Sequence, residues 1–358
     1  MEIKWFEKKD LIGLDIGASA VKVVQLKKIK KRQGKTYELM NLALSKLPPE
    51  VIKEDEFTKP DIVADTIRRT FADNKIEIKN VAVSISGRSV IVKRIKLPKM
   101  AAEELEESIQ WEAEQFIPFD INDVTLDFQI MPSEDVSADN MDVLLVAVKK
   151  DRITDIVNII ELAELIPSIV DIDSFALENQ FEINYTPSPE DYEALVDIGA
   201  ETMCLNVLKH GSSVFTRDAS IGINQLHRTM QREMFLDFSQ SEALLNGIEV
   251  EGRTKDEIIP YRDGFYEELL AEIQRSFDYF RATAEEGMVS SIFLSGGGSR
   301  LENFPEFLNE RLGVPVQIMD PFKNIFVNYK RFDQEYISSI APMMAVGIGL
   351  ALRRIGDR

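Results

Sequence analysis

Two aspartates, Asp15 and Asp197, each begin a short turn with the same sequence, "DIGA". The apolar segments on either side of each turn have the length of buried strands, so each predicts a β-hairpin. Small residues in a tight turn leave backbone N–H groups accessible to an anion, and a carboxylate at a strand end can hold Mg²⁺ through water. The turns therefore indicate binding of a metal-chelated polyphosphate. One turn alone is explained about equally well as an ordinary hairpin.

The two turns lie about half a chain apart in the 358 residues, in matching contexts, "LDIGASAVKVVQL" and "VDIGAETMCLNVL". A motif repeated at this spacing suggests two halves of related architecture. Two such turns facing each other across a cleft would hold a polyphosphate from both sides. We expect Asp15 and Asp197 to flank the metal, with the hydroxyls of Ser19 and Thr202 offered to phosphate oxygens.

A glycine-rich segment could complete the same site. The stretch "SSIFLSGGGSRLENFPEFLNERLG" (290–313) predicts a strand, a turn at Gly296, Gly297 and Gly298, and an amphipathic helix. Such a turn allows a flat ring to approach the backbone, and a helix N-terminus favours negative charge. The alternative, a long strand-to-helix turn without a ligand, is less favoured beside the two hairpins. A near-match to a P-loop, "GIEVEGRT" (247–254), has Arg253 where lysine belongs and is rejected.

The composition excludes several classes of function. The formal net charge of −19 argues against a nucleic-acid partner. One cysteine, Cys204, excludes internal disulfides, and with only His210 and His227 it leaves too few ligands for a typical zinc site. The same scarcity argues against a Ser-His-Asp or Cys-His mechanism.

Three segments bear on a membrane contact. The first ten residues, "MEIKWFEKKD", lack the apolar core of a signal peptide. The basic run "KKIKKRQGK" (27–35) predicts a solvated hairpin turn in preference to a contact with anionic lipid. The apolar run "IAPMMAVGIGLAL" (340–352) contains Pro342 and is too short for a bilayer span, so it predicts a buried helix.

The hairpins and the glycine-rich turn together resemble the actin/Hsp70/sugar-kinase ATPase superfamily. More narrowly, the chain resembles the PilM family of type IV pilus assembly over nearly its whole length. The stretches that carry the narrower resemblance are "QWEAEQFIPFD" (110–120), "VDIDSFALENQFE" (170–182) and "IFLSGGGSRLENFPEFLNERLGVPV" (292–316). It implies an α/β fold, the two-lobed actin-like ATPase fold with a duplicated core and a small inserted subdomain like that of the division protein FtsA.

The resemblance also implies a division of the chain. Residues 1–88 and 166–189 would form the first lobe, 89–165 the inserted subdomain and 190–336 the second lobe, and 337–358 a closing helix packed on the first lobe. The sequence agrees with the insertion, because "VIVKRIKLP", "VTLDFQIM" and "MDVLLVAVK" have strand patterns. The segments "AAEELEESIQWEAEQFI" and "DRITDIVNIIELAELI" have helical ones.

The implied cofactors are ATP or ADP with Mg²⁺, the metal held by Asp15 and Asp197 through water. The predicted cofactor contacts are Gly17, Ala18, Ser19, Ala20, Lys22, Gly199, Ala200, Glu201, Thr202, Glu242, Gly296, Gly297, Gly298 and Arg300. Glu242 lies in "GINQLHRTMQREMFLDFSQSEALL" (222–245), a stretch of helical period expected to cover the nucleotide, and it fits an acidic adenosine contact or an ordinary solvated position.

The chain departs from the family pattern at two places. Leu245 stands where a lysine contact to adenosine is expected. Ala18 and Ala20 flank Ser19 where related hairpins carry more serines, so hydroxyl donors are lost while backbone donors remain.

Asp173 matches the position at which actin-like ATPases orient the attacking water. It is therefore the candidate catalytic residue, although a role as the N-cap of its helix would explain it without catalysis. Whether the chain is an enzyme stays open, and it would be at most a weak ATPase.

The resemblance implies a cytoplasmic, nucleotide-dependent adaptor in pilus assembly and twitching motility, recruited to the inner membrane through its partners. Its partner would be PilN, with the PilN N-terminal peptide lying between the first lobe and the inserted subdomain; pilus motor ATPases are further candidates. An acidic helix face (Glu103, Glu104, Glu106, Glu107) followed by Phe116, Ile117 and Phe119 is consistent with such a groove, although these apolar residues could simply seat the subdomain. A small-molecule kinase and an FtsA-like division protein are the alternatives.

Overall fold

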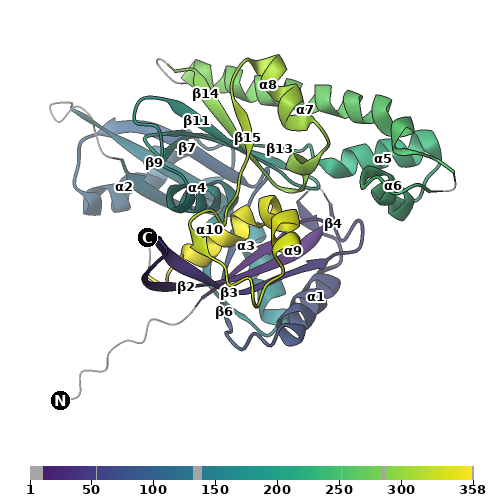
Figure 1. Cartoon of the computed structure of the whole chain (residues 1–358). Coiled ribbons are helices and arrows are strands. Elements are labelled where there is room, and N and C mark those ends of the chain that lie inside the picture. Colours follow the sequence, from purple (N-terminus) through teal and green to yellow (C-terminus); the bar gives the residue numbers. More distant parts are fainter. Residues whose placement is uncertain (1–10, 54, 132–138, 251, 284–286, 357–358) are drawn as a thin grey trace.

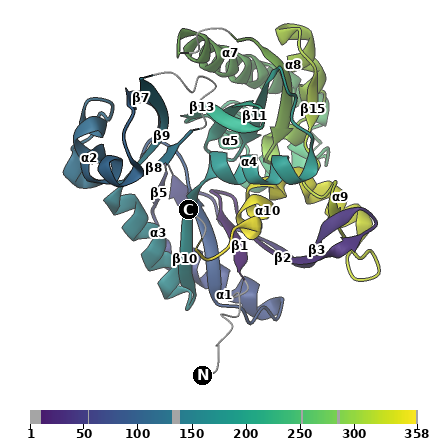
Figure 2. The ribbon, with the colours of Figure 1, turned by 90° about the vertical axis from the view of Figure 1, so that its left-hand side faces the viewer.

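The structure is a computed structural model that describes residues 11–53, 55–131, 139–250, 252–283 and 287–356. The charged first ten residues, from which the absence of a signal peptide was inferred, lie outside the described residues. The chain forms two α/β lobes, one above the other in Figure 1, and a smaller unit that projects to one side in Figure 2.

The first lobe is built on a six-stranded sheet in the order β10-β6-β1-β2-β3-β16. The strand β1 pairs antiparallel with β2 and parallel with β6, and β6 pairs parallel with β10. Both faces of the strand β1 are covered, because Ile12 and Leu14 are fully buried on one face and Gly13 lies against Gly347 and Ala351 on the other. The strands are β1 (Ile12–Ile16), β2 (Ala20–Arg32), β3 (Lys35–Lys46), β6 (Asn80–Ile85), β10 (Ile166–Ile172) and β16 (Ile325–Phe326).

The second lobe repeats this arrangement in a five-stranded sheet of order β13-β12-β11-β14-β15. Here β11 pairs antiparallel with β12 and parallel with β14, as β1 does with β2 and β6. The duplication read from the two "DIGA" turns is therefore present in the sheet topology. The strands are β11 (Tyr192–Ile198), β12 (Met203–Lys209), β13 (Ser212–Ala219), β14 (Val289–Ser295) and β15 (Val316–Ile318).

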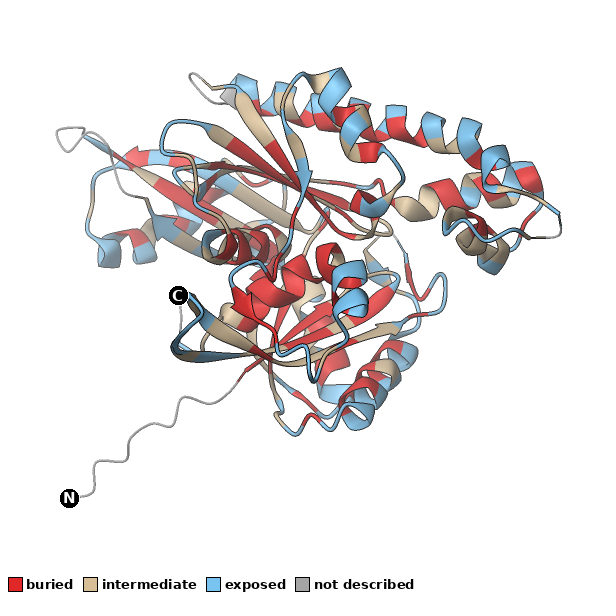
Figure 3. Ribbon diagram, in the orientation of Figure 1, coloured by how far each residue is buried: buried red, intermediate tan, exposed pale blue. Residues whose placement is uncertain are grey.

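Helices cover both sheets, and Figure 3 shows buried residues along the strands and on the sheet-facing sides of the helices. The α-helices of the lobes are α1 (Pro60–Asp73), α3 (Lys150–Leu162), α4 (Asp173–Asn184), α5 (Ile223–Met234), α6 (Phe238–Leu245), α7 (Ile259–Thr283), α8 (Phe304–Leu312), α9 (Gln334–Ile340) and α10 (Ala345–Leu352). Short 3₁₀ turns occupy Ile121–Asp123, Lys255–Ile258, Gly297–Arg300 and Ala341–Met344.

The stretch 222–245, expected to have one helical period, contains two helices. The chain takes a left-handed conformation at Phe235 (φ 56°) after α5. Asp237 then starts α6 with a capping box, in which its carboxylate accepts from the Gln240 N–H and the Gln240 side chain accepts from the Asp237 N–H. The break re-aims α6 relative to α5.

The smaller unit is a three-stranded antiparallel sheet, β7-β9-β8, with one helix packed on it. Its elements, β7 (Val90–Pro98), α2 (Ala102–Glu114), β8 (Val124–Ile130) and β9 (Asn140–Lys149), follow the strand and helix patterns of the sequence within a few residues. Its apolar core contains Leu105, Ile109, Ile117 and Leu145 and is separate from the cores of the two lobes. A two-stranded ribbon, β4 (Ile52–Lys53) with β5 (Glu56–Phe57), also precedes α1.

The helix α10 packs against the first lobe through glycines. A Cβ placed on Gly349 would lie 1.8 Å from the Ala176 carbonyl oxygen on α4, and one on Gly13 of β1 would lie 2.2 Å from the Gly347 carbonyl oxygen. The segment Gln334–Leu352 is long and apolar enough to span a membrane, but 67% of its most apolar window is buried inside the protein. It is the buried helical segment that the sequence predicted.

Candidate functional site

The two "DIGA" turns line one cleft between the lobes, with a cavity volume of about 280 Å³. Residues from β1, the β1–β2 turn, α4, the β11–β12 turn, α5, α6 and the turn after β14 all face it. The predicted residues that line it are Asp15, Gly17, Ala18, Ser19, Lys22, Asp173, Asp197, Gly199, Ala200, Glu201, Thr202, Glu242, Gly296, Gly297 and Arg300.

Two predicted contacts do not line the cleft. Ala20 is buried at the start of β2, and its carbonyl oxygen accepts from the Gly17 N–H. Gly298 is also buried, and a Cβ there would lie 2.3 Å from Cγ2 of Ile198. Both residues contribute to the shape of the turns without facing the cleft.

The two hairpin turns have the same local geometry. In the first, the Gly17 N–H donates to the Ala20 carbonyl (3.1 Å), and in the second the Gly199 N–H donates to the Thr202 carbonyl (2.8 Å). In each hairpin an aspartate two residues before the glycine is the next-to-last residue of the strand. The equivalence places Asp15 and Asp197 at matching points of the two sheets.

Asp15 forms an ion pair with Lys22, its cross-strand neighbour, with 2.7 Å between Oδ2 and Nζ. Burial lowers the pKa of Lys22, but the carboxylates of Asp15, Asp197 and Asp173 more than offset it, so the pKa is raised overall. The register of the second hairpin puts Cys204 opposite Asp197, which instead accepts a hydrogen bond from the Ser295 hydroxyl (2.6 Å). Burial raises the pKa of Asp197. Lys22 thus pairs with the carboxylate of the first hairpin and also interacts electrostatically with that of the second.

Asp173 is the first residue of α4, and its N-cap is Ile172, without a side-chain cap. The interpretation of Asp173 as an N-cap is therefore wrong. Its carboxylate instead accepts hydrogen bonds from Ser84 and Ser86, which lower its pKa, but burial and the charge of Asp15 raise the pKa to about 7. A carboxyl group that faces the cleft and titrates near neutrality has the character of a general base.

The glycine-rich turn has the backbone freedom expected of it. Gly296 has a φ of +79°, and a Cβ there would lie 2.4 Å from the Ile198 carbonyl oxygen of the second hairpin. Gly297, at the surface of the cleft, leaves room above Ile223 of α5. Only glycine permits this close approach of the third segment to the second hairpin.

Glu242, on α6, points across the cleft and forms an ion pair with Lys46 of β3, with 2.6 Å between Oε1 and Nζ. Around it, the apolar side chains of Ile223, Phe238 and Leu245 line the cleft. His227 of α5 also lines it, bonded through Nδ1 to the Ser241 hydroxyl. Burial lowers the pKa of His227 to about 4, so the imidazole is neutral at pH 7. These residues form a wall that suits a flat, uncharged ring.

Asp55, Ser86 and Arg152 line the cleft from the first-lobe side and were missed by the sequence reading. Ser86 precedes Gly87, whose φ of +90° marks a turn that could have been noticed. Asp55 and Arg152 carry no local motif, and only the tertiary fold brings them to the cleft.

A resident metal would depend on few protein ligands. Among the described residues there is no group of three or more His, Cys, Asp and Glu side chains arranged to hold a metal ion. Two carboxylates that act through water, with phosphate oxygens as the remaining ligands, suit Mg²⁺, which keeps several waters. The residues of the cleft therefore fit a metal that arrives with a polyphosphate.

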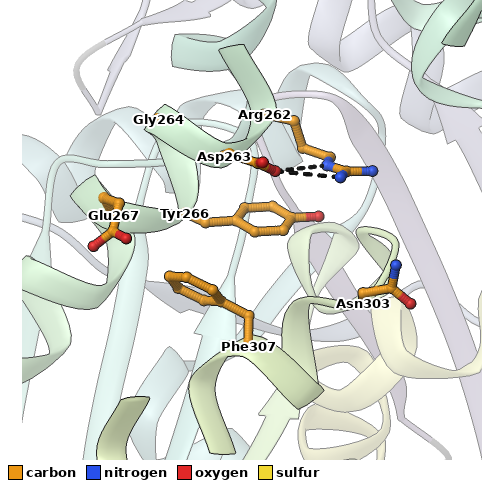
Figure 4. Close-up of a pocket in the computed structure, with 7 residues that line it drawn as sticks. All are labelled: Arg262, Asp263, Gly264, Tyr266, Glu267, Asn303 and Phe307. Atoms are coloured by element: carbon orange, nitrogen blue, oxygen red, sulfur yellow. Dashed lines mark hydrogen bonds and ion pairs between the residues drawn. The ribbon is translucent and has the colours of Figure 1, made fainter. Parts of the chain in front are cut away.

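A second cavity, of about 430 Å³, lies between α7 and α8 and holds none of the predicted residues (Figure 4). Tyr266 and Phe307 lie close together there, and Arg262 pairs with Asp263. The Tyr266 hydroxyl donates to the Glu302 carbonyl (2.7 Å), which fixes the ring. The contacts of this cavity are accounted for by packing of α8 on α7.

Comparison with known proteins gives a family match and a match of fold. A family described as type IV pilus assembly protein PilM matches residues 13–355. The fold matches a solved PilM-PilN type IV pilus biogenesis complex with a TM-score of 0.85 and 28% sequence identity, covering 97% of this chain and 98% of that one.

Two more distant structures show the fold alone. The ethanolamine utilization protein EutJ of Carboxydothermus hydrogenoformans has a TM-score of 0.55 at 14% identity, covering 95% of this chain and 88% of that one. MreB5 of Spiroplasma citri, solved with ADP, has a TM-score of 0.50 at 12% identity, covering 96% and 95%. The predicted two-lobed actin-like fold is confirmed.

Proposed function

The chain belongs to the family of type IV pilus assembly protein PilM, and from this premise we propose that it is an ATP-binding cytoplasmic adaptor of the pilus assembly complex. Its nucleotide state would be coupled to the binding of the N-terminal cytoplasmic tail of PilN. The observation that carries the nucleotide part is the pair of equivalent hairpin turns, with Asp15 and Asp197, on one cleft between duplicated lobes.

The cleft offers separate surfaces to the parts of the nucleotide. The backbone N–H groups of the two hairpin turns and the hydroxyls of Ser19 and Thr202 would receive the phosphates. The apolar wall of α5 and α6 and the turn at Gly296 and Gly297 would receive the base and sugar, with Glu242 near the ribose. Mg²⁺, when bound, would neutralise phosphate charge, and Asp15 and Asp197 would hold its waters.

The proposal includes slow hydrolysis of the nucleotide. Asp173 faces the cleft with a pKa of about 7 and could hold an attacking water at its carboxylate. Lys22 compensates the charge of Asp15 beside it. We propose at most a weak ATPase, since the adaptor role requires binding and release more than rapid turnover.

The partner part rests on the family and on the likeness to a PilM-PilN complex over nearly both chains. We place the PilN tail between the first lobe and the inserted subdomain. Ile117 is buried in the core of that subdomain, and Phe116 and Phe119 pack on it. This packing favours the alternative that these residues seat the subdomain, so the tail would contact other side chains of the groove.

The remaining assignments follow from the same family. The adaptor would stay in the cytoplasm and reach the inner membrane only through its partners, with motor ATPases as further candidates. A small-molecule kinase and an FtsA-like division protein are not favoured by the family match or by the likeness to the PilM-PilN complex.

Binding of a fluorescent ATP analogue to the purified chain, in Mg²⁺ and in EDTA, tests the nucleotide part. We expect saturable binding in Mg²⁺ that weakens at least tenfold in EDTA and in Asp15→Asn and Asp197→Asn. Asp278→Asn, on the exposed face of α7, is the matched control and should bind as the wild type does. A chain that is folded by circular dichroism and binds neither ATP nor ADP would refute this part.

The partner part has its own test. A labelled peptide with the sequence of the PilN N-terminal tail from the same organism should bind the full chain, and a scrambled peptide should not. Absence of binding with and without nucleotide would refute the adaptor proposal while leaving nucleotide binding intact.

A further inference from the structure

Four of the charged side chains that line the cleft form ion pairs. Lys22 pairs with Asp15, and Glu242 pairs with Lys46. Glu201 accepts from both Arg228 and Asn224. Among the cations that line the cleft, Arg152 and Arg300 differ from Lys22, because neither has an ion pair with any residue that the structure describes.

Arg152 is the more unusual of the two because it is half-buried. It lies in the first turn of α3, and its guanidinium stacks on the Phe57 ring, 4.4 Å from the centroid. Its Nη1 is buried and has no hydrogen-bond partner. Burial lowers the pKa of Arg152, and the nearby charges of Asp55 and Asp173 only partly offset this.

A buried guanidinium nitrogen without an acceptor costs folding free energy, so such groups in native proteins call for an explanation. Arg300 can turn toward solvent, since it is exposed. Arg152 is held by the stacking on Phe57, and it lines the cleft. Planar, bidentate donors of this kind match phosphate oxygens, which are the acceptors that the proposed ligand would bring.

The position of Arg152 indicates which phosphate of the ligand it would contact. Its charge interacts with that of Asp173, the carboxylate proposed to hold the attacking water. That water lies beyond the terminal phosphate in any in-line hydrolysis. Arg152 and Asp173 line the same cleft, so Arg152 would lie beside the terminal phosphate, whereas Arg300 belongs to the glycine-rich turn.

We propose that Arg152 binds the terminal phosphate of ATP and is the residue by which the cleft distinguishes ATP from ADP. This inference rests on the proposed nucleotide-binding function and names the residue that would respond to whether ATP or ADP is bound. The connection to the rest of the chain is short, since β9, the central strand of the three-stranded sheet, ends at Lys149 and α3 begins at Lys150. A change at Arg152 can thus reach the inserted sheet through one helix turn.

Equilibrium binding of ATP and ADP to the full-length chain in Mg²⁺ tests the proposal. In Arg152→Met we expect ATP to bind at least tenfold more weakly, while the Kd of ADP changes less than threefold. Arg152→Lys keeps the charge but not the planar fork and should lose part of the preference for ATP. Arg300→Met is the matched control and should change the Kd of ATP and ADP by the same factor.

The outcomes separate the two claims. Equal changes for ATP and ADP in Arg152→Met, or no change in either, would overturn the role of Arg152 even though the wild type binds both nucleotides. A wild type that binds neither would overturn the proposed function itself. If Arg152→Met does not fold, the test rests on Arg152→Lys. The proposal then requires that the ratio of ATP affinity to ADP affinity in Arg152→Lys be at least threefold lower than in the wild type, at an unchanged melting temperature.

Discussion

Lys46 and Glu242 form an ion pair that joins the two lobes, with 2.6 Å between Nζ and Oε1. Lys46 ends β3 of the first lobe, and Glu242 lies on α6 of the second. Their side chains are 71% and 39% exposed, so the pair lies at the open edge of the cleft. An exposed pair of this kind contributes about 0–1 kcal/mol to stability, so it can be exchanged for a ligand contact at little cost.

We predict that Glu242→Gln weakens the binding of ATP and of ADP by the same factor, about three- to tenfold. The reason is that the Glu242 carboxylate would leave Lys46 and accept hydrogen bonds from the ribose hydroxyls when the nucleotide binds. The free energy of unfolding should change by less than about 0.5 kcal/mol. Isothermal titration calorimetry and urea unfolding measure the two quantities. Lys46→Met is the control: it removes the same ion pair but leaves Glu242, and it should not weaken either nucleotide. Equal weakening in both variants would mean that closure of the lobes by this pair, not a ribose contact, is what matters.

The duplication of the fold was predictable because the same short sequence motif occurs at both hairpins. Each hairpin needs an aspartate, a glycine and small residues at fixed spacing, and the sheet pairings of Asp15 and Asp197 follow from that local requirement. The three-stranded unit was predictable for the same reason, since alternation and helical period are local signals.

The identity of several cleft residues was not predictable, because it depends on contacts between distant segments. Arg152 and Asp55 are brought together by packing of α3 near the β4–β5 ribbon, and no motif surrounds either residue. The ion pair of Glu242 with Lys46 joins residues 196 positions apart. The capping box at Asp237 is a local signal that could have revealed the break between α5 and α6.

The glycines of α10 give a stability prediction. Gly349→Ala should lower the free energy of unfolding by about 1–3 kcal/mol or more, because its Cβ would collide with the backbone of Ala176 and α10 would have to move away from α4. Gly264→Ala is the matched control. Gly264 lies on an exposed part of α7 with nothing within 4 Å of the added Cβ, so it should gain about 0.5–1 kcal/mol from helix propensity. Urea denaturation measures both, and a neutral Gly349→Ala would contradict the packing described.

His227 gives a prediction about pH. Its folded pKa of about 4 lies below the ordinary value of 6.5, so the unfolded chain binds the extra proton first as the pH falls. The contribution of His227 to stability is therefore present above pH 6.5 and is lost toward pH 4, by about 3 kcal/mol in total. Asp173 and Asp218 have raised pKa values of about 7 and 6, so they change stability in the opposite direction over part of this range.

The wild-type curve alone therefore cannot isolate His227, and the difference from a variant is needed. We expect the difference in unfolding free energy between the wild type and His227→Gln to shrink steadily from pH 7 to pH 4. His210→Gln, at an exposed turn, is the control for the loss of an imidazole that does not line the cleft. A flat difference for His227→Gln would show that folding does not shift the pKa of its imidazole.

Asp173 gives the prediction that separates binding from turnover. Asp173→Asn keeps the size of the side chain and can still bond Ser84 and Ser86, but it removes a negative charge that burial and Asp15 both oppose. At pH 8 we therefore expect the free energy of unfolding to rise by about 1 kcal/mol or more, and the affinity for ATP to stay within threefold of the wild type. The slow release of phosphate from ATP should fall at least tenfold, because the amide cannot take a proton from water. Asp61→Asn, exposed in the first turn of α1, should change none of these quantities. Unchanged phosphate release in Asp173→Asn would show that Asp173 lines the cleft but does not act as the general base for the attacking water.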